Sequence, residues 1–287
     1  MTVSVMLTYG LFAILAVFLL LFLKNVSSSV RKGEKKFSLP LLIVGFCFGF
    51  LDTLGVGGFA PTLSYLKHIQ KIRITEIADI LLLSFAVPTV LQTFIFVSSV
   101  SITPRLLILG ITVPVLGYII VNHIKSYIND RHIKLIVGSG LILSGSIALV
   151  QNLGFTTPDH NALLISPPKE IVIYVSVFFF GGLTNFGIGN FSPTLILFEL
   201  LGLDPHMGFP IMMGACALIM LISGLKEKTF TNMKIFIPLS ISTGMIVAVP
   251  LGVYFIHNMN LRLISWLVIL ISIFSGLQTI IDKKEAA

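Results

Sequence analysis

The sequence predicts an all-α integral membrane protein made of two inverted-topology repeats, and three observations lead to that fold class. The chain of 287 residues has a mean hydropathy of +1.01 and only 11% charged residues, whereas soluble domains carry about 25%. Apolar segments of the length that crosses a bilayer recur from end to end. A fifteen-residue motif also occurs once in each half. No segment is polar and long enough to form a separate soluble domain, and nucleic acid is not an expected partner.

The apolar segments give the expected helices in chain order. Residues 3–23 are expected to form a retained transmembrane helix rather than a signal peptide, because their start is uncharged and basic residues follow them. This extra helix and its basic loop (1–36) precede repeat 1 (37–151) and repeat 2 (165–282). The further apolar segments lie near 39–54, 76–99, 105–123, 133–151, 171–186, 206–225, 234–256 and 261–281, with shorter ones near 61–70 and 193–203.

The duplicated motif reads GFLDTLGVGGFAPTL at 49–63 and GGLTNFGIGNFSPTL at 181–195, with eight of fifteen positions identical. Glycine and proline clusters break helices and expose backbone polar groups that lipid cannot satisfy. A pair of such breaks in corresponding positions of two halves indicates a transporter's binding site. Close helix packing through small residues is the alternative interpretation. A weaker match, Pro114/Tyr118 with Pro250/Tyr254, also supports a duplication.

The distribution of lysine and arginine favours one of two topologies under the positive-inside rule. If both motif segments cross the bilayer fully, the cytoplasmic side holds 12 of the 19 basic residues. If each motif region is instead a re-entrant hairpin, that side holds 16, and only Arg105, Lys169 and Arg262 lie outside. Each repeat is then a hairpin plus three transmembrane helices, so the repeats are inverted. We expect a multi-pass protein of the cell (inner or cytoplasmic) membrane, with its N-terminus outside and its C-terminus cytoplasmic.

The residue types at the breaks suit an anion. Glycine can adopt positive φ and lets a ligand approach the backbone. Proline is favoured at the first position of a helix, so Pro61 and Pro193 are expected to start the returning helices, with Ser192 as an N-cap. Helix N-termini present free N–H groups and positive dipole ends to anions. The predicted substrate-binding residues are Asp52, Thr53, Gly55, Gly57, Gly58, Thr62, Asn185, Gly187, Gly189, Asn190, Ser192 and Thr194.

Asp52 is the one carboxylate at an apparent crossing depth. A central, lipid-exposed carboxylate would cost about 2.5–3.5 kcal/mol, so we expect Asp52 to face the interior. Two roles stay open: a proton or cation relay, which makes Asp52 the candidate for proton coupling, and a cap for backbone amides freed by the break. The second copy has Thr184 in its place. We expect Gln92 to form a hydrogen bond between helices and Glu199 to be solvated at the outer mouth.

The sequence does not predict a metal site or a catalytic site. No spacing of His, Cys and Asp resembles a metal site, and no cofactor is expected. An enzyme is not expected either, because Ser192 and His206 are the only conceivable nucleophile and base and nothing orients them.

The two motifs resemble the signature of the sulfite exporter TauE/SafE family, also called the toluene-sulfonate uptake permease family. The resemblance covers residues 39–281, and the chain differs from the family's pattern at Asp52, Ala60 and Asn190. Its strongest carriers are Gly55-Val56-Gly57-Gly58 with Pro61 and Gly187-Ile188-Gly189-Asn190 with Pro193.

This resemblance implies a permease that moves sulfite, organosulfonates or related sulfur or carboxylate anions, mostly outward. We therefore expect a secondary transporter that works by alternating access and holds the anion between two hairpin tips. An anion channel of the same architecture is the alternative. The expected partners are the small anion and the lipid bilayer, with a second copy of the chain as a further candidate.

Overall fold

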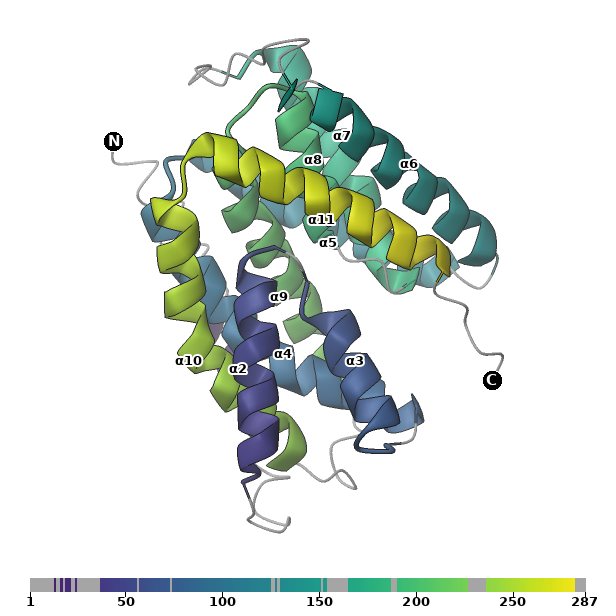
Figure 1. The fold of residues 1–287 in the computed structure, drawn as a ribbon, viewed down its shortest axis with the longest axis vertical. Helices are drawn as coiled ribbons and strands as arrows, with labels where there is room; N and C mark the ends of the chain where they lie inside the picture. Colours follow the sequence, from purple (N-terminus) through teal and green to yellow (C-terminus); the bar gives the residue numbers. More distant parts are fainter. Residues whose placement is uncertain are drawn as a thin grey trace. The chain divides into compact units, whose positions relative to one another are not determined.

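The computed structural model describes residues 13, 16–17, 19–21, 24, 37–55, 57–72, 74–124, 127, 130–150, 152–153, 165–186, 190–226 and 236–281. Most of the expected first helix, together with Gly187 and Gly189, lies outside them. Every element in the described residues is a helix (Figure 1), which confirms the all-α prediction. The elements are α2 (Leu39–Thr53), α3 (Phe59–His68), α4 (Ile74–Ser99), α5 (Pro104–Ile124), α6 (Asp130–Val150), α7 (Pro167–Leu183), the short 3₁₀ helix η3 (Thr184–Phe186), α8 (Phe191–Leu200), η4 (Pro205–Met207), α9 (Gly208–Lys226), α10 (Phe236–Asn258) and α11 (Leu261–Ile281).

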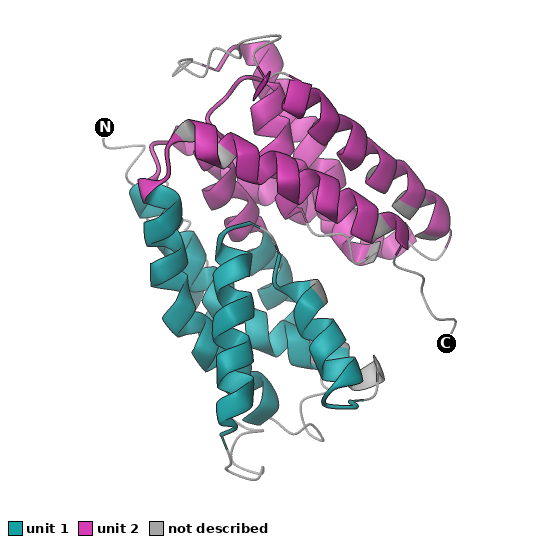
Figure 2. Cartoon of the chain, in the orientation of Figure 1, with its two compact units in different colours: residues 1–99, 216–257 teal, residues 100–215, 258–287 magenta. Residues whose placement is uncertain are grey.

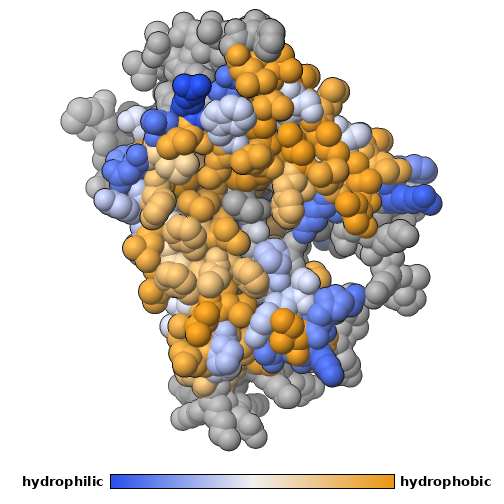
Figure 3. Space-filling view, in the orientation of Figure 1, coloured by the Kyte–Doolittle hydropathy of each residue, from blue (hydrophilic) through white to orange (hydrophobic). Residues whose placement is uncertain are grey.

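The lengths and surfaces of these helices are those of a membrane-embedded protein. Among the described residues, four stretches are long and apolar enough to cross a membrane: Ile80–Ser99, Pro104–Ile124, Pro205–Gly224 and Phe236–Asn258. Large apolar side chains are also exposed on several helices, for example Phe179 at 60% and Leu270 at 66% (Figure 3). Extended apolar surface of this kind is covered by lipid rather than water. The chain is therefore embedded in a membrane.

The helices form two compact units, and each unit contains helices from both of the predicted repeats (Figure 2). Unit 1 comprises residues 1–99 and 216–257, and unit 2 comprises residues 100–215 and 258–287. Unit 1 thus holds α2, α3, α4, α10 and the second part of α9. Unit 2 holds α5, α6, α7, α8, α11 and the first part of α9.

In unit 1, α2 packs closely against α10 because glycines lie at their crossing. A Cβ atom at Gly49 would lie 2.7 Å from Met245 Cα, and one at Gly252 would lie 2.6 Å from Thr53 Cβ. Any side chain at these positions would force the helices apart. The core of this unit includes Leu41, Leu66, Ile77, Ile80, Leu81, Phe85, Ile241 and Met245.

In unit 2, α7 packs against α5 in the same manner. A Cβ atom at Gly181 would collide with the carbonyl of Pro114, and one at Gly117 would collide with the carbonyl of Phe178. By the duplicated motif α7 corresponds to α2, and by the proline and tyrosine match α5 corresponds to α10. In both units, therefore, the helix that precedes a break packs against a helix from the other half of the sequence. The core includes Leu106, Ile173, Val177, Phe198, Leu203 and Ile211.

Candidate functional site

The first break is a sharp reversal of the chain between α2 and α3 (Figure 1). Gly55 and Gly57 have φ angles of 84° and 88°, a conformation that glycine adopts without the steric cost of a side chain. The glycines are therefore required by the backbone path itself. No heavy atom lies within 4 Å of the position that a Cβ of Gly57 would occupy, so open space adjoins this residue.

Asp52 joins the two ends of the first break. It lies in the last turn of α2 with none of its surface exposed. Its Oδ1 accepts a hydrogen bond of 2.8 Å from the backbone N–H of Gly58, the N-cap residue of α3. A carboxylate at this position satisfies an N–H of the helix start and interacts favourably with the helix dipole. Of the two roles predicted for Asp52, this geometry corresponds to the cap.

Gln92 of α4 connects the same carboxylate to Thr53. Its Nε2 donates to Thr53 Oγ1 at 2.8 Å and to Asp52 Oδ2 at 3.3 Å, which confirms the predicted bond between helices. Asp52, Thr53 and Gln92 are all fully buried. Gln92 Oε1 is also buried and accepts no hydrogen bond from the described residues. An unpaired buried acceptor is uncommon and calls for an explanation.

Most of the other donors predicted at the first break are already used within unit 1. The Gly55 N–H donates to the carbonyl of Asp52 at 2.9 Å. The hydroxyl of Thr53 donates to Gly49 O, and that of Thr62 donates to Gly58 O. Gly57, also predicted to bind substrate, differs from these residues because its backbone borders open space.

The second break is held by different side chains. Thr184, at the position of Asp52, donates to Gly181 O at 2.7 Å. Asn185 Nδ2 donates to the carbonyls of Tyr118 and Gly182, and Asn190 Nδ2 lies 3.4 Å from Met212 O. The described part of this break has a neutral hydroxyl where the first break has a carboxylate.

The helix starts predicted from proline and serine are wrong by two positions. α3 begins at Phe59 and α8 at Phe191, so Pro61 and Pro193 occupy the third helical position. The N-cap of α8 is Asn190, and Ser192 lies inside the helix, with its hydroxyl 2.7 Å from Ser275 Oγ. Proline fits there because no N–H in the first turn has an acceptor within the helix. Thr194 is buried in the same first turn, and its N–H donates to Asn190 O.

The prediction that Glu199 is solvated is also wrong. Its side chain is only 2% exposed, and its Oε2 accepts a hydrogen bond of 3.0 Å from Ser265 of α11. The reason is that α8 is buried along most of its length within unit 2. Ser265 provides the partner for the carboxylate, but it is one of three serines in α11, so the sequence alone did not identify it.

A cavity of about 240 Å³ adjoins the start of α8 in unit 2. Its walls come from α6, α7 and α8 and are almost entirely apolar. The lining residues are Gly140, Leu141, Ser144, Phe180, Leu183, Pro193, Ile196, Leu197 and Leu200. Such a cavity suits a small apolar group.

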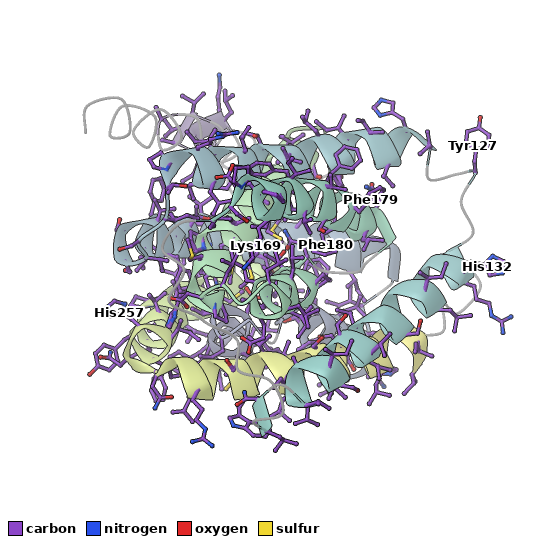
Figure 4. The ribbon with its side chains drawn as sticks, turned by 90° about the horizontal axis from the view of Figure 1, so that it is seen from above. Tyr127, His132, Lys169, Phe179, Phe180 and His257 are labelled. Carbon is purple, nitrogen blue, oxygen red and sulfur yellow. The ribbon has the colours of Figure 1, made fainter. Side chains whose placement is uncertain are left out.

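Two histidines lie near helix ends, and Lys169 binds a carbonyl of the backbone. His132 and His257 extend outward from the start of α6 and the end of α10 (Figure 4). Lys169 Nζ donates to Leu201 O at 2.6 Å, where it satisfies a carbonyl at the end of α8. In the described part of the chain, no three His, Cys, Asp or Glu side chains are grouped so that they could hold a metal ion.

Comparisons of the chain with models of protein families, with curated proteins and with solved structures found no match.

Proposed function

We propose that this protein is a secondary transporter of a small organic or sulfur-containing anion, such as sulfite, an organosulfonate or a related carboxylate. The motifs resemble those of the TauE/SafE family, and export is the direction that this resemblance favours. The observation that carries the proposal is the glycine-dependent break at the head of α3, where the backbone of Gly57 borders open space. Backbone N–H groups at such a helix start attract anions without a fixed positive charge.

Two features of the helices support a fold of inverted repeats with re-entrant hairpins. α2 has 15 residues, and α3 and α8 have 10 each. At about 1.5 Å per residue, none of them spans the roughly 30 Å of a hydrocarbon core. The reciprocal packing of α2 on α10 and of α7 on α5 is what a duplicated chain would produce. With these hairpins the chain has seven crossings, an external N-terminus and a cytoplasmic C-terminus.

The cavity in unit 2 adjoins the second break, because Pro193 belongs to both the cavity wall and the first turn of α8. An organosulfonate or carboxylate bound at that break would bury the apolar surface of its organic part there, at about 25 cal/mol per Å² removed from water. This cavity therefore supports anions with an organic part within the proposed class.

Flux of radiolabelled sulfite and toluenesulfonate into proteoliposomes tests the proposal. Gly57→Asn preserves the positive φ, which asparagine tolerates better than most residues, but fills the open space. The asparagine side chain would keep the anion away from the backbone N–H groups at this break. We therefore expect flux to fall at least about tenfold, which corresponds to the loss of one hydrogen bond to a charged group. Gly202→Asn is the matched control, because Gly202 also has positive φ (66°) but lies at the end of α8.

Two outcomes would contradict the proposal. Flux equal to that of empty liposomes would exclude transport of these anions. Equal loss of flux in Gly57→Asn and Gly202→Asn would show that the break has no specific role. Single-channel currents in planar bilayers, in place of saturable counterflow, would instead identify the alternative function, an anion channel.

A further inference from the structure

We propose that the Asp52 carboxylate is an internal occupant of the anion site at the first break, so that an external anion binds at the head of α3 only when Asp52 carries a proton. This inference rests on the proposed transport function and specifies how protons are coupled to it. It predicts that the anion and one proton move together.

The Asp52 carboxylate binds the Gly58 N–H in the way that an anionic substrate would. Asp52 Oδ1 receives the Gly58 N–H at 2.8 Å, at the N-cap of α3. A sulfonate or carboxylate substrate would present the same kind of oxygen to the same donor. The side chain therefore occupies a position that an anionic ligand would need, and it does so with a matching charge.

Among the described residues, no cation balances the negative charge of an ionised Asp52. Asp52 is fully buried, and the described groups that act on it are the Gly58 N–H, the Gln92 carboxamide and the nearby Cys216 thiol of α9. From α2, α3, α4 and α10, no described charged side chain is among them. Two negative charges in contact at a site shielded from water repel strongly. An ionised Asp52 thus excludes a second anion, whereas a neutral one does not.

The unpaired oxygen of Gln92 indicates independently that the hydrogen bonds among Asp52, Thr53 and Gln92 have a second arrangement. Gln92 Oε1 is buried without a donor, while Nε2 of the same carboxamide faces Asp52 Oδ2. A proton taken from water by Oδ2 creates an O–H that needs an acceptor. Rotation of the carboxamide by half a turn places Oε1 opposite that O–H, so that the new O–H···Oε1 bond replaces the bond from Nε2 to Asp52 Oδ2. The same rotation breaks the bond from Nε2 to Thr53 Oγ1 and turns Nε2 to the side where Oε1 now lies. The Gly58 N–H loses a charged acceptor and becomes available to the substrate.

The second break provides a comparison within the chain. Thr184 occupies the position of Asp52, and its hydroxyl donates to Gly181 O. A neutral hydroxyl does not titrate in the physiological range and does not repel an anion. The dependence of anion binding on pH should therefore reside in the first break alone.

Binding of toluenesulfonate to the full-length protein in detergent, measured between pH 5 and pH 8, tests this inference. Toluenesulfonate keeps one negative charge throughout this range, so any pH dependence belongs to the protein. Because protons leave Asp52 as the pH rises, wild-type affinity should fall at least tenfold from pH 5 to pH 8. Asp52→Asn should bind equally at both ends of the range, as tightly as the wild type at pH 5.

Two control variants show whether the pH dependence of binding belongs to Asp52. Asp52→Thr copies the residue of the second break and is the second neutral variant if Asp52→Asn does not fold. Asp204→Asn removes a carboxylate that pairs with His206 in unit 2, and it should keep the wild-type pH dependence. Persistence of the pH dependence in a folded Asp52 variant, or loss of binding at every pH, would overturn the inference. Tight but pH-independent binding by the wild type would overturn this inference alone, whereas absence of wild-type binding at every pH would overturn the proposed function as well.

Discussion

At the scale of single residues, the first break is closed by one side chain that the sequence singles out. Asp52 was predicted to face the interior because a carboxylate is costly in lipid, and it is fully buried. A cap for backbone amides was one of the two roles predicted for it, but Gly58 could not be identified as the partner, because the glycines between them permit many chain paths. Glu199 shows the converse, since its burial follows from how α8 packs and not from its local sequence.

Truncation of Asp52 should weaken the fold locally. Asp52→Ala leaves the Gly58 N–H without its acceptor and Gln92 Nε2 with one acceptor fewer. An unsatisfied buried donor costs about 1–3 kcal/mol, and the free energy of unfolding should fall by that amount. Thermal unfolding of the purified protein in detergent measures the change. Asp52→Asn, which retains a carbonyl oxygen for Gly58, should lose less, and an equal loss would contradict the capping role.

At the scale of helices, the apolar segments predicted most boundaries to within a few residues. The segment 105–123 became α5 (Pro104–Ile124), and 261–281 became α11. Apolar length is a strong constraint because lipid tolerates few polar residues inside a segment. The starts of α3 and α8 were predicted less well, since proline fits any position of the first turn.

The crossing of α2 and α10 should be sensitive to any added side chain. Gly252→Val would place its Cβ 2.6 Å from Thr53 Cβ. Because this distance is a steric clash, α10 would have to move away from α2. Overpacking of this kind costs about 1–3 kcal/mol, and the melting temperature in detergent should fall. Gly140→Ala is the control, because nothing lies within 4 Å of its Cβ position. Equal melting temperatures for both variants and the wild type would contradict this crossing.

At the scale of the whole molecule, composition alone predicts membrane embedding, and the exposed apolar side chains agree with it (Figure 3). The composition of the two units could not be predicted in the same way. The predicted repeats are continuous in the chain, whereas unit 1 combines α2 with α10 and unit 2 combines α7 with α5. Glycines at 49, 117, 181 and 252 indicate close packing but do not identify the partner helix.

The predicted orientation can be measured with single cysteines at uncharged, exposed loop positions. Ser101→Cys, near Arg105, should react with a membrane-impermeant maleimide added outside intact cells. Gln70→Cys, beside Lys71, should react only after the membrane is permeabilised. A Cys47→Ser background removes the exposed native thiol, and neither substitution changes a charge that sets the topology. The reverse pattern, or reaction of both positions from outside, would contradict a cytoplasmic loop after α3.

Counterflow of radiolabelled toluenesulfonate in proteoliposomes tests whether this protein is a carrier with an anion site at the first break. A carrier with a site at the first break should give saturable accumulation of label driven by unlabelled anion inside. That accumulation should fall at least about tenfold in Gly57→Asn and persist in Gly202→Asn. Absence of counterflow in the wild-type protein, or undiminished counterflow in Gly57→Asn, would contradict the assignment of an anion site to this break.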